Sequence, residues 1–195
     1  MIKEKDFKIT MNQIWILAKP YLEMGTMKNF IIHSKGVLLA MTMLLKKEKG
    51  DKEILLPAAI LHDVGFSKVS KELQKSNDKA VKTKVLRQHL EFAPEIIKEI
   101  LNKVGYNKND IDEVIQIVIA HKFQDPKELD KQLLIDADTL SDVFKEQFYS
   151  DAKAYNKTPQ EFYNVRKDNK FYTKTAKNIF YQELKNRKEE IFIKK

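Results

Sequence analysis

Apolar residues recur at the three- to four-residue spacing of an amphipathic helix along almost the whole chain. The sequence contains no run of alternating β-branched residues, which would indicate a strand, and no Asn-Gly hairpin turn. The spacing predicts helices over residues 7–24, 27–48, 53–64, 79–103, 110–122, 127–150, 159–166 and 171–192. We therefore expect an all-α fold, a single-domain helical bundle over residues 1–195.

Capping and terminating residues set several of these boundaries. Gly65 is expected to end the most apolar helix, which should run through the centre of the bundle. Asn109 or Asp110 can cap the helix that follows, because their side chains accept hydrogen bonds from its first N–H groups. Thr158 followed by Pro159 is typical of a helix start.

The composition narrows the functional classes. The 195-residue chain has a formal net charge of +8. It contains no cysteine, and this absence excludes disulfides, thiolate metal sites and cysteine nucleophiles. No apolar run approaches the roughly 20 residues of a membrane helix, and residues 1–10 contain no signal-peptide core, so we expect a cytoplasmic protein without membrane contact. The positive charge favours a polyanionic partner, but scattered lysines favour a small phosphorylated molecule over nucleic acid. The sequence leaves a homo-oligomer open.

Three aspartates lie in apolar surroundings, where a charged carboxylate is costly. Asp63 ends the segment ILLPAAILHD, and Asp136 and Asp138 lie in LLIDADTL. Neither run contains a lysine or arginine to pair with these carboxylates, and desolvating one alone costs several kcal/mol. A divalent cation would resolve the conflict, since carboxylate and imidazole groups both coordinate such ions.

The histidines point to the same chemistry. All four lie within or beside predicted apolar helices: His33, His62, His89 and His121. A single histidine in this setting is usually a core or surface residue, but here every histidine of the chain occurs in it. Together with the three aspartates, they predict a metal centre.

The pattern His33, His62-Asp63 and Asp138 resembles the HD-domain superfamily of metal-dependent phosphohydrolases. The stretch ILHDVG is similar to the central metal-binding helix of that superfamily, and IDADTL is similar to its late aspartate motif. A weaker similarity over KFYTKTAKNIF extends to a C-terminal helix of some small, single-domain members. The resemblance implies a metal-binding core at about residues 20–145 and C-terminal helices at about 146–195.

The resemblance also implies the metal ligands, which are His33, His62, Asp63, His89, His121 and Asp138. One divalent ion would be held by His33, His62 and Asp138, and a second by His89 and His121, with Asp63 bridging both. Members with a single ion do without the last two histidines; we favour two ions because these histidines have no other evident role. The sequence does not distinguish Fe, Mn, Mg, Zn, Co and Ni. Asp136 could hydrogen-bond a ligand histidine, cap a helix or face solvent.

The sequence departs from the family pattern at one point. Many dinuclear members continue as HD-x-G-K, whereas the first lysine after this motif is Lys68, which either reaches the site or lies in solvent. Among the cations near the ligands, which include Lys122, Arg87 is the preferred phosphate-binding residue because a guanidinium binds phosphate bidentately. Arg87 could instead pair with Glu91. The candidate catalytic residues are Asp63, Arg87 and Lys68.

A centre of this kind suits hydrolysis of a phosphate ester. A divalent cation lowers the pKa of bound water to roughly 7, so hydroxide can attack phosphorus without a nucleophilic side chain. We expect a metal-dependent phosphohydrolase acting on a nucleotide or a related small phosphate ester. The alternatives are an HD-type mixed-valent di-iron oxygenase, which shares this ligand set, and a non-catalytic helical ligand-binding or signalling module, which should lack ligands. Aromatic residues after residue 145 could stack on a nucleobase or pack in the core.

Overall fold

The computed structural model describes residues 4–193, and the side chains of residues 6–193. Within this range the chain forms ten α-helices and one 3-10 helix (η1) and contains no strand, which confirms the all-α prediction. The elements are α1 (Glu4–Met24), α2 (Phe30–Leu44), α3 (Lys52–Leu61), η1 (Val64–Lys68), α4 (Lys71–Gln74), α5 (Lys79–Lys103), α6 (Lys108–Ile119), α7 (Leu129–Ser141), α8 (Lys145–Ala154), α9 (Pro159–Arg166) and α10 (Lys174–Phe192). None of these described helices is both long and apolar enough to cross a bilayer.

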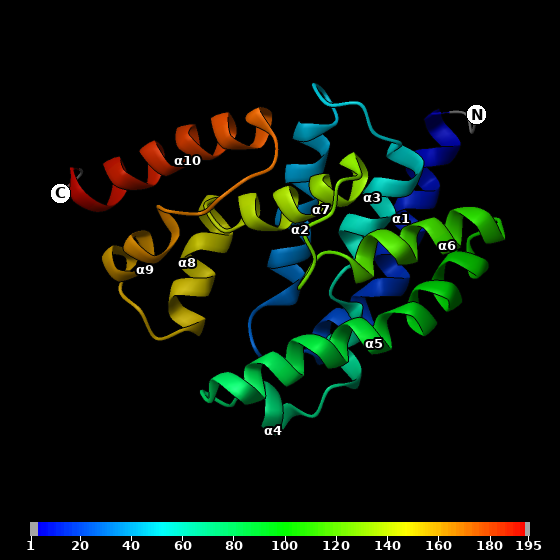
Figure 1. Cartoon of the computed structure of the whole chain (residues 1–195), viewed down its shortest axis with the longest axis horizontal. Coiled ribbons are helices and arrows are strands. Elements are labelled where there is room, and N and C mark those ends of the chain that lie inside the picture. Colours follow the sequence, from blue (N-terminus) through cyan, green and yellow to red (C-terminus); the bar gives the residue numbers. More distant parts are fainter. Residues whose placement is uncertain (1–3, 194–195) are drawn as a thin grey trace.

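Helices α2, α3 and α7 form the centre of the bundle, and the other elements pack around them (Figure 1). Helix α5 packs against η1 and α6 on one side, whereas α8, α9 and α10 lie on the other (Figure 1). One apolar core extends from Ile14 in α1 to Leu184 in α10, and a smaller cluster fills the space between α8 and α9. Phe148, Phe162 and Phe180 are buried in these clusters, so several of the C-terminal aromatic residues serve packing.

Side-chain caps account for most helix starts. An Asn or Asp precedes α2, α3 and α5 and accepts a hydrogen bond from the first turn: Asn29, Asp51 and Asp78. Thr158 caps α9 with Pro159 at its first position, as predicted. The prediction for α6 was wrong, because Asn107 is the cap and accepts from the backbone N–H of Asp110.

The helix predicted over residues 127–150 was also wrong, since two helices, α7 and α8, occupy this range. They are separated by a turn in which Val143 and Phe144 are buried, and Phe144 has the extended backbone of an N-cap residue. The apolar spacing continues through this turn, so the sequence pattern gives no sign of it. The turn directs α8 against α2, where it contributes to the site described below.

Gly65 lies where η1 crosses α5 at very close range. Helix α3 ends at Leu61, before the Gly65 predicted to end it, and the chain continues into η1. A β-carbon at Gly65 would lie 1.9 Å from the carbonyl oxygen of His89 and 2.9 Å from the backbone nitrogen of Ala93. Only a residue without a side chain therefore allows the helix that carries His89 to approach the segment that follows Asp63.

Replacing Gly65 by alanine should destabilise the protein strongly. Overpacking typically costs about 1–3 kcal/mol, and here the clashing atoms are backbone, so we expect the upper end of this range or more. Urea unfolding measures the loss as a lower midpoint at an unchanged slope. The control is Gly105→Asn, because Gly105 has a positive φ that Asn tolerates and a β-carbon there meets no atom within 4 Å. Equal stability of the two variants would contradict the steric argument.

Asp136 anchors the start of α10 to α7. Its carboxylate is buried and accepts hydrogen bonds from the backbone N–H of Tyr172 at 2.8 Å and of Thr173 at 2.8 Å, and from the Thr173 hydroxyl at 2.7 Å. Thr173 is itself the N-cap of α10. None of the three roles considered for Asp136 fits: it is buried, Thr173 is the cap, and Asp136 accepts no hydrogen bond from a histidine among the described residues. Instead it holds the segment that leads into α10.

We expect Asp136→Ala to destabilise the protein by about 3 kcal/mol, because a buried donor left unpaired costs about 1–3 kcal/mol and several lose their acceptor here. Asp136→Asn keeps an accepting oxygen and should lose less. Denaturant unfolding followed by circular dichroism measures both losses. A loss below about 1 kcal/mol for the alanine variant would show that these hydrogen bonds contribute little.

Candidate metal centre

The six predicted ligands converge on one buried point from separate elements. His33 lies in α2, His89 in α5 and Asp138 in α7. His62 and Asp63 follow the last residue of α3, and His121 is the second residue after the end of α6. All six side chains are buried, and the most exposed, Asp138, has a relative exposure of 7%. The bundle therefore brings together residues that are up to 105 positions apart in the sequence, from His33 to Asp138.

Asp63 lies between two pairs of histidines and turns one carboxylate oxygen to each pair. Its Oδ2 atom is 3.2 Å from His33 Nε2 and 3.3 Å from His62 Nε2. Its Oδ1 atom is 3.8 Å from both His89 Nε2 and His121 Nε2. This is the arrangement that a carboxylate bridging two ions requires.

The ligand atoms form two groups of three that could each hold an ion. The first consists of His33, His62 and Asp138, with Asp138 Oδ1 3.1 Å from His33 Nε2. The second consists of Asp63, His89 and His121. Within each group the ligand atoms lie within 4.8 Å of one another. This division is the one that the family resemblance implied for two ions.

The histidine nitrogens fit a metal ion. The Nδ1 atoms of His62 and His121 face the backbone carbonyls of Ala59 and Val118. Because a carbonyl only accepts, Nδ1 carries the proton in both rings and Nε2 presents its lone pair to the centre. The Nε2 atoms of His89 and His121 are buried and have no hydrogen-bond partner among the described residues. A coordinated cation would satisfy these nitrogens, which otherwise cost free energy by being buried unpaired.

The first two histidines also face each other closely. The Nε2 atoms of His33 and His62 are only 3.0 Å apart. The His62 Nε2 atom presents a lone pair, so the two nitrogens need either a shared proton or a cation between them.

Electrostatics keep both ligand carboxylates and His89 in the forms that bind metals. Burial alone would raise the pKa of Asp63, but His62 and Lys28 outweigh it and hold this pKa well below its usual value. Burial likewise opposes ionisation of Asp138, and Lys122 outweighs it and lowers the pKa. Burial, with the nearby His121, lowers the pKa of His89 to about 3, so its imidazole is neutral. Ionised carboxylates and neutral imidazoles are the ligand forms.

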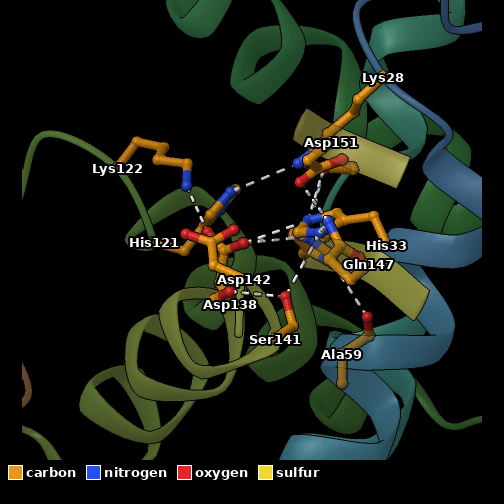
Figure 2. Close-up of polar contacts among 12 residues, drawn as sticks. Lys28, His33, Ala59, His121, Lys122, Asp138, Ser141, Asp142, Gln147 and Asp151 are labelled. Atoms are coloured by element: carbon orange, nitrogen blue, oxygen red, sulfur yellow. Dashed lines mark hydrogen bonds and ion pairs between the residues drawn. The ribbon is translucent and has the colours of Figure 1, made fainter. Parts of the chain in front are cut away.

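Two lysines lie beside the ligand carboxylates (Figure 2). Lys28 Nζ is 3.4 Å from Asp63 Oδ2, and Lys122 Nζ forms an ion pair with Asp138 Oδ2. Lys122 was among the cations that the sequence placed near the ligands, whereas Lys28 was missed. Its position directly before Asn29, the cap of the helix that carries His33, could have indicated it.

Residues of α7 and α8 hold His33 from behind. The side-chain amide of Gln147 lies 3.0 Å from His33 Nδ1 and 2.7 Å from Asp151 Oδ2, and all three residues are buried (Figure 2). The Ser141 hydroxyl lies 3.5 Å from the same Nδ1 atom. The sequence analysis missed these residues, because the turn before α8 was not predicted.

The two other candidate catalytic residues lie away from the ligands. Arg87 is exposed on α5, and its guanidinium lies 4.7 Å from the centre of the Phe123 ring. It does not form the alternative ion pair with Glu91 among the described residues. Lys68 is exposed at the end of η1. Neither residue lines the cavity of about 450 Å³ that opens onto the predicted ligands.

A cavity of about 450 Å³ opens directly onto the centre and is called the metal cavity below. Asp63 and Asp138 line it together with Lys28 and Lys122. Asp142 and Arg166 also line it and form an ion pair at 3.1 Å. The cavity therefore gives a small anionic molecule access to both ligand carboxylates and to several cationic side chains.

A helical bundle with a divided His/Asp centre defines a class of metal-binding proteins, and comparison with known proteins names the family. The family model of the HD domain matches residues 30–143, which is more than half of the chain. The chain therefore belongs to the HD domain family, which confirms the resemblance carried by the His62-Asp63 motif.

One similar solved structure is the crystal structure of a predicted HD superfamily hydrolase from an uncultured Thermotogales bacterium. It matches with a TM-score of 0.62 and 20% sequence identity over 92% of this chain and 88% of that chain. At this identity the similarity concerns the fold. No curated protein matches the chain.

Proposed function

We propose that this protein is a metal-dependent phosphohydrolase that acts on a nucleotide or a related small phosphate ester. The coarser class, a metal-dependent hydrolase, is supported by the family and by the two ligand groups, and by the description of the Thermotogales protein as a predicted hydrolase. The observation that carries the proposal is the position of Asp63, whose two oxygens join the ligand groups at the base of a cavity containing Lys28 and Lys122.

The residues of the chain have distinct roles in this proposal. His33, His62 and Asp138 would hold one divalent ion, and His89 and His121 the other, with Asp63 shared. When bound, such ions lower the pKa of a coordinated water and neutralise phosphoryl oxygens. Phosphoryl transfer depends on positioning and on charge, so the cations that contact the phosphate matter as well.

Lys28 and Lys122 supply that charge better than Arg87 and Lys68, the two cations that the sequence analysis named as candidate catalytic residues. Both line the metal cavity, whereas Arg87 and Lys68 do not. Burial opposes the charge of Lys28, but Asp63 and Asp138 outweigh it and raise the pKa of Lys28, so its ammonium group stays charged. With both aspartates engaged as ligands, these ammonium groups would donate to phosphoryl oxygens instead.

The cationic side chains also bear on the oxygenase alternative. A small substrate oxidised by dioxygen has no general need for several cations around the centre, whereas a phosphate ester has.

The deciding experiment is elemental analysis of the purified protein, followed by a nucleotide panel with Mn, Mg, Zn, Co, Ni and Fe. We expect divalent metal and release of phosphate or pyrophosphate. Iron together with an oxygen-dependent oxidation, and no release from any ester, would overturn the proposal in favour of the oxygenase.

A further inference from the structure

A second cavity, of about 620 Å³, adjoins the metal cavity and is called the side cavity below. The α4–α5 loop (residues 75–78) and the α8–α9 loop (residues 155–158) provide much of its lining. The two cavities share Met27, Lys82, Tyr155 and Arg166, so they adjoin along these four residues. A molecule bound at the metal centre can therefore extend into the side cavity.

The side cavity contains four cationic side chains, and among them only Arg166 is paired with a carboxylate, that of Asp142. Lys75, Lys82, Lys157 and Arg166 line it, and no acidic side chain does. The three lysines form no ion pair with a carboxylate among the described residues, and the Lys82 ammonium group has only Asn77 Oδ1 at 3.5 Å. The Nε atom of Arg166 is buried and has no hydrogen-bond partner among the residues that the structure describes. Such a group of donors and charges suits an anion with several oxygens, such as a phosphate.

The metal cavity has a different charge balance. Asp63, Asp138 and Asp142 line it, and each lies beside a cation, so its charge becomes strongly positive only when ions are bound by the ligands. The side cavity needs no metal for its positive charge. The two cavities are therefore suited to two separate anionic groups.

The wall shared by the cavities indicates what connects these groups. Besides Lys82 and Arg166 it contains Met27 and Tyr155, and Tyr155 has a relative exposure of 37%. One face of the Tyr155 ring is backed by Phe162, with the planes inclined by 15° and the centroids 6.3 Å apart. The exposed Tyr155 ring gives an organic scaffold an aromatic surface to contact, whereas a continuous phosphate chain would contact only the cations of this wall.

We propose that the side cavity binds a second phosphate group of the substrate, separate from the one that is hydrolysed. The substrate is accordingly a bisphosphate whose two phosphates are carried by a sugar or nucleoside scaffold that contacts Tyr155. This inference rests on the proposed phosphohydrolase function and narrows its substrate class.

The first test measures binding without catalysis. Adenosine 3′,5′-bisphosphate is titrated calorimetrically into the full-length protein in EDTA, and into the variant Lys75→Gln/Lys157→Gln. We expect the variant to bind at least about tenfold more weakly, because it loses charged hydrogen bonds to the phosphate. The control Lys185→Gln/Lys188→Gln removes the same net charge from exposed positions on α10 and should bind as the parent protein does.

The second test uses the metal-loaded protein. We expect kcat/KM for adenosine 3′,5′-bisphosphate to exceed that for adenosine 5′-monophosphate by about tenfold or more, and Lys75→Gln/Lys157→Gln to bring the ratio close to one. The control variant should keep the ratio.

The outcomes separate the two proposals. No binding of the bisphosphate in EDTA, or equal weakening in the side-cavity and control variants, would overturn the second phosphate site. Phosphate release without a preference for the bisphosphate would also overturn it, while the phosphohydrolase function would stand. Binding that depends on Lys75 and Lys157 with no phosphate release from any ester would support the phosphate site and overturn the phosphohydrolase function.

Discussion

Replacing Asp63 by alanine is expected to abolish the bound metal and the hydrolytic activity together. Each Asp63 oxygen faces a different pair of histidines, so a single substitution would remove a ligand from both of the proposed ions. Loss of a residue that only supports a ligand costs about 10- to 100-fold in metal affinity or activity, so loss of a shared ligand should cost about 1,000-fold or more. Elemental analysis and phosphate release from the best substrate of the panel measure the two effects.

The control for this prediction is an aspartate of the same size outside the site. Asp112 is exposed on α6, and Asp112→Ala should keep both metal and activity. Asp63→Asn preserves the shape of the side chain and tests whether the negative charge is needed. Circular dichroism should show folded protein for each variant before the metal is measured. Normal metal content in Asp63→Ala would contradict the bridging role.

Replacing His89 by alanine should divide the centre and leave one ion in place. His89 belongs to the group with Asp63 and His121, whereas the other group consists of His33, His62 and Asp138. We therefore expect the metal content to fall from two ions to one per chain and the activity to fall by about 100-fold. The matched variant Asp138→Ala removes a ligand of the other group and should also leave one ion.

The result separates a dinuclear from a mononuclear centre. If the parent protein binds one ion and His89→Ala keeps that ion with full activity, His89 is not a ligand and the second group is not a metal site. If both His89→Ala and Asp138→Ala lose all metal, the two positions depend on each other and are not filled separately.

The sequence predicted the fold and the ligands better than their surroundings. The spacing of apolar residues predicted the helices, because burial of one helix face requires it. The ligand set came from the resemblance to the HD domain, since the convergence of His33, His89 and Asp138 depends on packing that local patterns do not contain. The structure brings all six residues together as that resemblance implied.

The position of Arg87 has a geometric explanation that the sequence already contained. Arg87 precedes His89 by two residues within α5, and side chains two positions apart on a helix do not share a face. Because His89 points inward, Arg87 points away from the centre. Lys122 also neighbours a ligand, but it lies after the end of α6, where helical spacing no longer applies, and it reaches Asp138.

Lys28 and Gln147 were missed for a different reason. Lys28 precedes α2 in a loop, and Gln147 reaches His33 only because the chain turns between α7 and α8. Both contacts depend on the direction in which an irregular segment leaves a helix. Apolar spacing does not encode that direction, and the resemblance to the family did not extend to these two residues.

The double use of α7 limits how far this protein can be shortened. On one side α7 presents Asp138 to the candidate metal centre, and two residues earlier Asp136 holds the start of α10. A fragment restricted to residues 30–143, the stretch shared with other HD domains, would contain every ligand and yet lose the amide behind His33 and the whole layer held by Asp136. Such a fragment should bind metal poorly, because Gln147 and the layer that contains α10, which hold the candidate ligands in position, lie outside it.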